Sequence, residues 1–524
     1  MKTALRLAGV LAVITTVCAQ TNPRPLPRLV HKDGRYALFV DDAPYLMLGA
    51  QVGNSSAWPG VLPKVWPAIE YLHPNTVEMP VYWEQFEPRP GRFDYSVMDT
   101  LLAQARQHHV HLVLLWFGLY KNGSQHYTPE WMKLDPASYQ YITGKDGRPV
   151  DSPSPFAKAS LDADIHAFTA FMRHLKEVDA ERTVLLVQVE NEAGTWQVQR
   201  DYSAAAQKLF DAPVPAEVLA AMRVPAGPPA PDWQTAFGAE AEVNFHAWAV
   251  ATYVGKVAAA GKAVYPLPLY ANAALRRAIP PGAPGTYESG GPTDNVLPIW
   301  KAEAPALDIL APDIYVEDSA EYFKVMELYH RDDNPLFIPE TSHSAGVARF
   351  LFSALGQGTI GFSPFGLDYV EGGTEKEFEP IAQDYRLLIP LTRQLARLSF
   401  EGKLKAAVEV KGEVSQTLDF GAWKAEVSYG LGRYNTPRAH DGPALGRALV
   451  GQLGANQFLV TGISARVDFH PSAAGKQRQF LRVEEGTYED GVFRMIRIWN
   501  GDETDWGINF RVEPVVLRVS LTTY

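Results

Sequence analysis

Eight short apolar segments recur between residues 44 and 395, and segments with helical periodicity separate them. Most are continuous apolar runs rather than alternating ones, which is typical of strands buried on both faces of a parallel sheet. The expected strands are Tyr45–Gly49, Thr76–Val81, His111–Phe117, Val184–Val189, Ala263–Tyr270, Ile309–Tyr315, Pro335–Pro339 and Thr359–Ser363. Eight strand–helix units predict an α/β fold, a (β/α)8 TIM barrel; an open doubly wound sheet is the alternative.

Local signals refine this outline. Helices are expected over Met98–His108 and over Asp162–Val178, whose apolar residues fall on one face. A hairpin is expected over Tyr36–Ala43, with its turn at the adjacent aspartates. The longest connection, between the fourth and fifth strands, contains a proline-rich stretch at 225–231 that must be a loop. We interpret this connection as an insertion beside the active-site face.

The pattern changes near residue 396, where short alternating segments are separated by Gly, Asn and Asp. These segments are Lys405–Val410, Trp423–Tyr429, Gln457–Thr461, Ala465–Phe469 and Val492–Trp499. Alternation predicts an antiparallel C-terminal β-sandwich domain over residues 396–524, whose role the sequence leaves open between bracing, carbohydrate binding and oligomerisation. The catalytic barrel with its N-terminal lead-in is expected over residues 20–395.

The first nineteen residues have the features of a secretory signal peptide. Lys2 and Arg6 precede the apolar run Leu7–Val17, and Cys18 and Ala19 provide a small-residue cleavage site. The apolar run is shorter than the roughly 20 residues that span a bilayer. We therefore expect a periplasmic or secreted protein without an integral membrane segment after cleavage; a lipidated Cys18 is the alternative.

Composition restricts the partners. The formal net charge is −11 and there are no basic runs, which argues against nucleic acids and anionic membranes as partners. The only cysteine is Cys18, so a chain cleaved after Ala19 has neither disulfides nor thiol chemistry. A small-molecule or oligosaccharide substrate fits this composition, while the oligomeric state stays open.

Two glutamates follow buried strands directly. Glu192 ends the fourth expected strand and Glu340 ends the seventh. In a (β/α)8 barrel the C-terminal ends of the strands meet on one face, where the active site lies. Cleavage of a glycosidic bond needs two carboxyl groups on either side of that bond. This pair therefore predicts glycoside hydrolase chemistry, although one glutamate after a strand can equally be a helix cap or a salt-bridge partner.

The segment Gln188–Gly194, with the sequence QVENEAG, resembles the Q-x-E-N-E-x-G motif of the glycoside hydrolase family 35 β-galactosidases. The resemblance implies that Glu192 is the acid/base, that Glu340 is the nucleophile, and that Asn191 binds the sugar 2-hydroxyl. The segment 81–94 also looks like the family segment that follows strand two. The R-P-G-P-Y segment of many members is absent from strand three, where the residues at 114–123 look closer to a divergent bacterial branch or to family 42.

Five further residues lie where strands end and are candidates for substrate binding. Tyr315 can hydrogen-bond the nucleophile, and Tyr82, Trp116, Asn122 and His343 can contact the sugar; for each, a place in the core or in a loop is the alternative. Burial and the charge of the nucleophile should raise the pKa of the acid/base. No metal and no cofactor are expected.

The resemblance implies a retaining exo-β-galactosidase that releases terminal β-galactose from oligosaccharides, such as the plant cell-wall side chains of xyloglucan. Two alternatives stay open. One is another retaining β-glycosidase of the same clan, and the other is an inactive carbohydrate-binding barrel.

Overall fold

The computed structural model describes residues 24–430, 442–489, 491–511 and 513–524. Its centre is a closed barrel of parallel strands in the order β10-β11-β12-β13-β4-β5-β6-β9. The strands are β4 (Met47–Gln51), β5 (Thr76–Tyr82), β6 (His111–Lys121), β9 (Val184–Asn191), β10 (Leu269–Ala274), β11 (Ile309–Ile314), β12 (Ile338–Thr341) and β13 (Gly361–Pro364). The predicted (β/α)8 barrel is confirmed, and the doubly wound alternative is excluded because β13 pairs with β4 and closes the sheet. The predicted signal peptide, including Cys18, lies outside the described residues.

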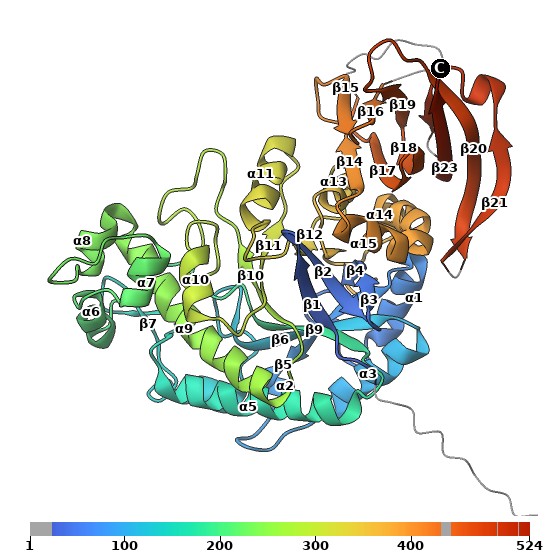
Figure 1. Cartoon of the computed structure of the whole chain (residues 1–524). Helices are drawn as coiled ribbons and strands as arrows, with labels where there is room; N and C mark the ends of the chain where they lie inside the picture. Colours follow the sequence, from blue (N-terminus) through green and yellow to red (C-terminus); the bar gives the residue numbers. More distant parts are fainter. Residues whose placement is uncertain (1–23, 431–441, 490, 512) are drawn as a thin grey trace, which may run out of the picture.

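Helices surround the barrel and connect its strands (Figure 1). They are α1 (Leu62–Leu72), α2 (Trp83–Phe86), α3 (Ser96–Gln107), α4 (Glu130–Lys133), α5 (Lys158–Val178), α10 (Leu297–Glu303), α11 (Ser319–Tyr329), α12 (Ala345–Ala348), α13 (Phe350–Gly356), α14 (Glu375–Leu388) and α15 (Thr392–Phe400). The helices predicted from periodicity correspond to α3 and α5. No helix among the described residues has the length and apolarity to cross a bilayer.

A small sheet precedes the barrel. It contains β1 (Arg28–Lys32), β2 (Arg35–Val40) and β3 (Ala43–Tyr45) in that order. The turn between β2 and β3 is made by Asp41 and Asp42, whose φ angles are 51° and 59°. Two consecutive left-handed residues are what a tight two-residue hairpin turn requires, and Asp accepts this conformation more readily than most side chains. The predicted hairpin is therefore confirmed.

The long connection between β9 and β10 is mostly helical. It contains α6 (Ala204–Phe210), α7 (Ala216–Ala221), α8 (Trp233–Phe237), the 3-10 turn η1 (Gly238–Glu240) and α9 (Ala241–Val264). The proline-rich stretch at 225–231 is a loop between α7 and α8, as predicted. A short two-stranded sheet, β7 (Tyr141–Thr143) with β8 (Pro149–Pro153), lies in the connection before α5.

The C-terminal region consists of two antiparallel sheets, which confirms the predicted sandwich-like β domain (Figure 1, orange to red). The larger sheet contains β14 (Leu404–Val408), β17 (Arg447–Gly454), β18 (Gln457–Ile463), β23 (Val515–Thr523), β20 (Arg478–Glu489) and β21 (Val492–Trp499); the smaller contains β15 (Ser415–Asp419), β16 (Trp423–Ser428), β19 (Ala465–Pro471) and β22 (Ile508–Phe510). Side chains from both sheets, among them Trp423, Phe458 and Phe469, form a separate core.

The β domain is joined to the barrel by buried polar and apolar contacts. The barrel core extends into the larger sheet through Leu404, Leu449 and Val516. Arg447 on β17 forms a buried ion pair with Asp384 on α14, with Nη2 at 2.6 Å from Oδ1. The predicted domain boundary at 395/396 falls inside α15, and that helix packs against β14 and β17.

A second link runs through Arg349, which lies between α12 and α13. Its Nε donates to the carbonyl of Glu409 in the β domain at 3.1 Å, and its Nη2 donates to Ser319 Oγ at the start of α11 at 2.9 Å. Since α11 follows β11 and α12 follows β12, this arginine connects the β domain to two neighbouring βα units of the barrel.

Candidate active site

Glu192 is the first residue after β9, at the C-terminal face of the barrel. Its φ angle is +43°, a left-handed conformation that is uncommon for residues other than glycine. The strain is compensated by an anchor on each side of the residue: its N–H donates to Asn272 Oδ1 at 3.0 Å, and its carbonyl accepts from Gly123 N–H at 3.0 Å. These anchors fix the backbone from which the carboxyl group projects, as expected for a strained position at a functional site.

Glu340 lies in β12 and is 7% exposed. One of its oxygens accepts from Tyr315 Oη at 2.6 Å and the other from Gln51 Nε2 at 3.0 Å. The predicted hydrogen bond between Tyr315 and Glu340 is therefore confirmed. Hydrogen-bond donors stabilise the ionised form of a carboxyl group. Both contacts therefore favour Glu340 as a carboxylate.

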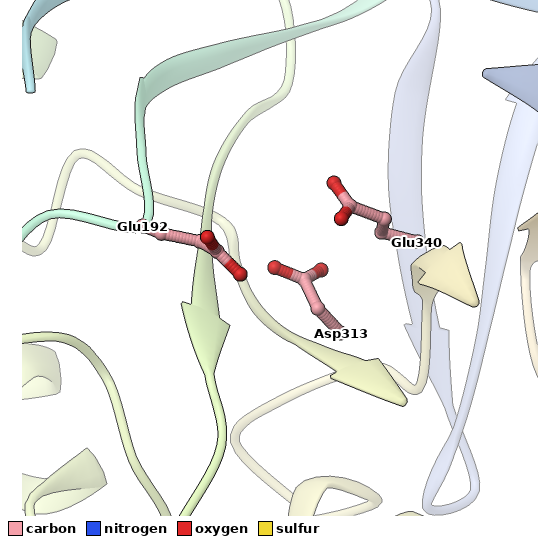
Figure 2. Close-up of side chains that lie close together, drawn as sticks. All are labelled: Glu192, Asp313 and Glu340. Atoms are coloured by element: carbon pink, nitrogen blue, oxygen red, sulfur yellow. The ribbon is translucent and has the colours of Figure 1, made fainter. Parts of the chain in front are cut away.

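Glu192, Glu340 and Asp313 project into one space. One carboxylate oxygen from each of the three residues lies within 4.8 Å of the corresponding oxygens of the other two. Figure 2 shows the three carboxyl groups pointing toward one another from three different strand ends. The predicted pair is thus brought together, although 148 positions separate its members along the sequence.

The environment of Glu192 favours its protonated form. Burial, reinforced by the charge of Glu340, raises the pKa of Glu192 to about 7, while Lys121 acts in the opposite direction. The direction and both causes agree with the expectation from the sequence. Two carboxyl groups with contrasting environments are suited to different roles, one as a proton donor and one as a charged group.

Asp313 was not among the predicted site residues. It lies near the end of β11, is 4% exposed, and accepts a hydrogen bond from Asn272 Nδ2 at 2.7 Å. Burial first, and then the charges of Glu340 and Glu192, raise the pKa of Asp313 well above its usual value. The sequence did contain a signal for this residue, because Asp313 belongs to the sixth expected strand and precedes Tyr315 by two positions.

Asn191, the last residue of β9, is fully buried. Its Oδ1 accepts from Lys121 Nζ at 2.8 Å, and Lys121 also donates to Asn122 Oδ1. Among the described residues no partner was found for Asn191 Nδ2. The lysine thus fixes the orientation of the amide and leaves its donor group available. Asn122 is exposed and has a φ angle of 51°. The structure therefore places Asn191 and Asn122 in one network, with Lys121 as a member that sequence reasoning missed.

Trp116 does not lie at the C-terminal face of the barrel with Glu192 and Glu340. Its indole is fully buried in the layer between β6 and α5, where Nε1 donates to Asp164 Oδ1 at 3.0 Å and the ring contacts Phe168 and Phe171. The same layer holds Glu190, which accepts from the backbone N–H of Tyr120 at 2.6 Å. Trp116 therefore has the core position that was its alternative, and Glu190 lies in the same buried layer.

Tyr82 and His343 are both engaged by protein groups. Tyr82 is fully buried, stacks between Trp58 and Tyr127, and its hydroxyl accepts from the N–H of Ala57 at 3.0 Å. Trp58 is 37% exposed, so the outer member of this stack offers an aromatic face to solvent. His343 is half-buried and lies 3.1 Å from the carbonyl of Phe365. Sugar contacts by Tyr82 and His343 stay predictions.

The three clustered carboxylates could also hold a metal ion by proximity. However, Tyr315 and Gln51 donate to Glu340, and Asn272 donates to Asp313, so protein hydrogens already occupy acceptor sites that a cation would need. This arrangement suits acid–base chemistry better than metal ligation. The expectation that no metal is required stays a prediction.

The comparison with family models gives one match. A domain of unknown function, DUF5597, matches residues 381–511, which include the C-terminal half of α14, all of α15 and most of the β domain. No match was found among curated protein sequences.

Several solved structures resemble the chain at low identity. A β-galactosidase from Bacillus circulans sp. alkalophilus is 11% identical, with a TM-score of 0.49 over 67% of this chain and 57% of its own length. A β-galactosidase from Rahnella sp. R3 is 14% identical, with a TM-score of 0.49 over 70% of this chain and 58% of its own. An exo-β-1,4-mannosidase from Opitutaceae bacterium strain TAV5 is 13% identical, with a TM-score of 0.40 over 68% of this chain and 61% of its own length. This chain thus spans less than two thirds of the length of each.

Proposed function

We propose that this chain is a retaining glycoside hydrolase in which Glu340 is the nucleophile and Glu192 is the acid/base. The observation that carries the proposal is the distance of at most 4.8 Å between oxygens of the two carboxyl groups. Retaining enzymes hold the two carboxyl groups about 5–5.5 Å apart, whereas inverting enzymes need roughly 6.5–9.5 Å to admit a water molecule between acid and base. The spacing therefore supports the retaining mechanism.

The surroundings of each carboxyl group support its role. Glu340 is held by two donors as an ionised nucleophile. Glu192, with its pKa raised to about 7, can hold a proton near neutral pH. A general acid works best when its pKa is close to the pH of the reaction.

The mechanism has two displacements. In the first, Glu340 bonds to the anomeric carbon while the bond to the leaving oxygen breaks and Glu192 gives that oxygen its proton. In the second, Glu192 takes a proton from water, the water oxygen bonds to the anomeric carbon, and the ester with Glu340 breaks. The first step removes the charge of Glu340, and this lowers the pKa of Glu192. Glu192 is then more stable as a carboxylate and can act as a base.

The substrate proposal is more specific. We infer an exported exo-β-galactosidase that acts on oligosaccharides, with the side chains of xyloglucan as one candidate; the QVENEAG motif supports galactose. The buried Nδ2 of Asn191, held in place by Lys121, is suited to donate to the sugar 2-hydroxyl. A contact of this kind strengthens as charge develops at the adjacent carbon in the transition state.

A panel of nitrophenyl β-glycosides tests the activity and the sugar. Turnover excludes the inactive carbohydrate-binding barrel, and the preferred sugar distinguishes a β-galactosidase from other retaining β-glycosidases. Proton NMR of the first-formed product should show the β-anomer, since two displacements retain configuration. An α-anomer would overturn the retaining mechanism.

Glu340→Gln tests the nucleophile. We expect kcat to fall by about four powers of ten or more, which corresponds to over ~5 kcal/mol of transition-state stabilisation, because an amide cannot form the glycosyl ester. Glu317→Gln is the matched control, since it removes one negative charge from an exposed position between β11 and α11. A folded Glu340→Gln protein with the activity of the wild type would refute the assignment.

A further inference from the structure

We propose that Asp313 is a positioning residue that stays neutral throughout the reaction and donates a hydrogen bond from Oδ1 to the carboxyl group of Glu192. This inference rests on the proposed function, because it assigns a role in the same site. It also makes a separate claim about the resting protein, namely that the three clustered carboxyl groups do not carry three negative charges.

Asp313 is held in place by Asn272. Asn272 donates from Nδ2 to Asp313 Oδ2 at 2.7 Å, and the Oδ1 of the same amide accepts from the backbone N–H of Glu192 at 3.0 Å. One side chain therefore positions both Asp313 and Glu192. This leaves Asp313 Oδ1, which is buried and for which no partner was found among the described residues. A buried oxygen without a partner is costly, and a proton directed at Glu192 would satisfy it.

Two other carboxyl groups lie close to that of Asp313. Glu192 and Glu340 each bring a carboxylate oxygen within 4.8 Å of Asp313. Lys121 is the cation that acts on this cluster, but its ammonium group donates to Asn191 and Asn122. Like charges at such distances disfavour full ionisation, and a protonated member removes the conflict.

The other titratable groups around the cluster include three tyrosines, which are neutral near pH 7, and two further buried carboxyl groups. The carboxyl groups are Glu78, beside Glu340, and Glu288, beside Glu192; burial raises the pKa of both. Tyr315 follows β11 directly and donates to Glu340. Tyr270 on β10 donates to Glu78 at 3.1 Å, and Tyr329 on α11 donates to the carbonyl of Pro292 at 2.8 Å. None of them therefore supplies a compensating charge. Burial and the neighbouring carboxylates act together to keep the pKa of Asp313 raised well above its usual value.

Asp313 contributes without gaining or losing a proton. In the first displacement the proton of Glu192 moves to the leaving oxygen, and Glu192 becomes a carboxylate that accepts from the Asp313 O–H. In the second displacement Glu192 recovers a proton from water. The hydrogen bond is strongest while Glu192 is charged, so Asp313 stabilises the state in which Glu192 has given up its proton.

The test compares Asp313→Asn with Asp313→Ala. The asparagine can accept from Asn272 through its oxygen and donate to Glu192 through its amide, as a protonated aspartic acid would. We expect Asp313→Asn to keep kcat/KM within about threefold and to leave the basic limb of its pH profile in place. Asp313→Ala should lower kcat/KM by about 10- to 100-fold, the effect of losing a hydrogen bond to a charged group.

The opposite result would overturn the proposal. If Asp313 were ionised in the resting protein, Asp313→Asn would remove a negative charge beside Glu192 and move the basic limb to lower pH by about a unit. It would also lose as much activity as Asp313→Ala. Glu317→Gln again controls for a general change of charge, and circular dichroism compares the folding of the variants.

An infrared difference spectrum of wild type minus Asp313→Asn provides a readout without turnover. We expect a carbonyl band of a protonated carboxylic acid that persists above the pKa of Glu192. Without this band, Asp313 is ionised and the inference fails, even if the protein hydrolyses glycosides. With the band but no hydrolysis of any glycoside, the protonation of Asp313 stands while the proposed function fails.

Discussion

At the scale of single residues, Glu192 combines three features: a left-handed backbone, a largely buried carboxyl group, and a second carboxylate within 4.8 Å. Burial and the charge of Glu340 both raise its pKa, and Lys121 lowers it. The balance of these effects sets the pH range in which Glu192 can act as an acid.

The pH dependence of kcat/KM tests this balance. The acid form of Glu192 is lost as pH rises through about 7, so kcat/KM should fall above that pH. Lys121→Met removes a positive charge that favours the carboxylate, so the pKa of Glu192 should rise and the basic limb should move to higher pH. A limb that moves to lower pH in Lys121→Met would contradict the assignment of Glu192 as the acid. Lys133→Met, on α4, is the control for loss of a lysine charge.

Sequence reasoning located the site residues that can be identified from their position at the end of a strand. Glu192, Glu340 and Tyr315 follow or close buried strands, and the structure brings them together. Trp116 does not join them, because its indole faces outward from β6 and packs against α5. Alternation along a strand decides which side chains face the barrel interior, and a continuous apolar run does not show which alternate residues point inward.

At the scale of elements, the eight barrel strands lie where apolar runs predicted them, and the main error concerns the fifth. The predicted strand Ala263–Tyr270 begins inside α9, which continues to Val264, and β10 starts only at Leu269. Helix α9 ends with Ala263 and Val264, which follow Lys262 in its last turn, so the apolar run that continues to Tyr270 begins inside the helix. An apolar run of this length does not distinguish a buried helix end from a strand.

The loop after β10 is packed tightly against the end of β9. Thr195 and Ser289 form a pair of backbone hydrogen bonds at 2.8 and 2.9 Å. A Cβ atom added at Gly194 would lie 2.5 Å from the carbonyl oxygen of Ser289 and 3.0 Å from Cγ of Glu288. The glycine two positions after Glu192 is therefore needed for this close approach.

Gly194→Ala should displace the loop and disturb Glu192. We expect the free energy of unfolding to fall by about 1–3 kcal/mol, the usual cost of overpacking, and kcat/KM to fall with it. Denaturant unfolding and kinetics measure the two effects. Gly60→Ala is the control, because no atom lies within 4 Å of its added Cβ. Equal stability of the two variants would show that the loop can move away without cost.

At the scale of the whole molecule, the barrel and the β domain share a core and a buried ion pair. Asp384 is fully buried, and burial raises its pKa to about 6 although the Arg447 charge and hydrogen bonds lower it. Desolvation thus outweighs the attraction of the partner. Such a pair contributes little net stability when intact, but removal of one partner leaves a buried charge alone.

Asp384→Ala should therefore be strongly destabilising. We expect a loss of about 3–5 kcal/mol in the free energy of unfolding, because the guanidinium of Arg447 is only 4% exposed and would lose its counter-charge. The double variant Asp384→Leu with Arg447→Met should recover much of this loss. Glu401→Ala is the control, since its pair with Arg397 is solvent-accessible and such helix pairs contribute only ~0.3–0.5 kcal/mol. A fall of less than ~1 kcal/mol in the free energy of unfolding of Asp384→Ala would contradict this expectation.

The position of Arg349 has a consequence for how the molecule comes apart. Its guanidinium contacts the β domain on one side and the start of α11 on the other, and the residue itself follows α12. Helix α11 follows β11, which carries Asp313, and α12 follows β12, which carries Glu340. We therefore expect the barrel and the β domain to unfold as one cooperative unit. Heat or denaturant should abolish turnover and the circular dichroism of the β-sheets in one transition, and a shortened gene ending after Phe400 should yield a chain that fails to accumulate as folded protein.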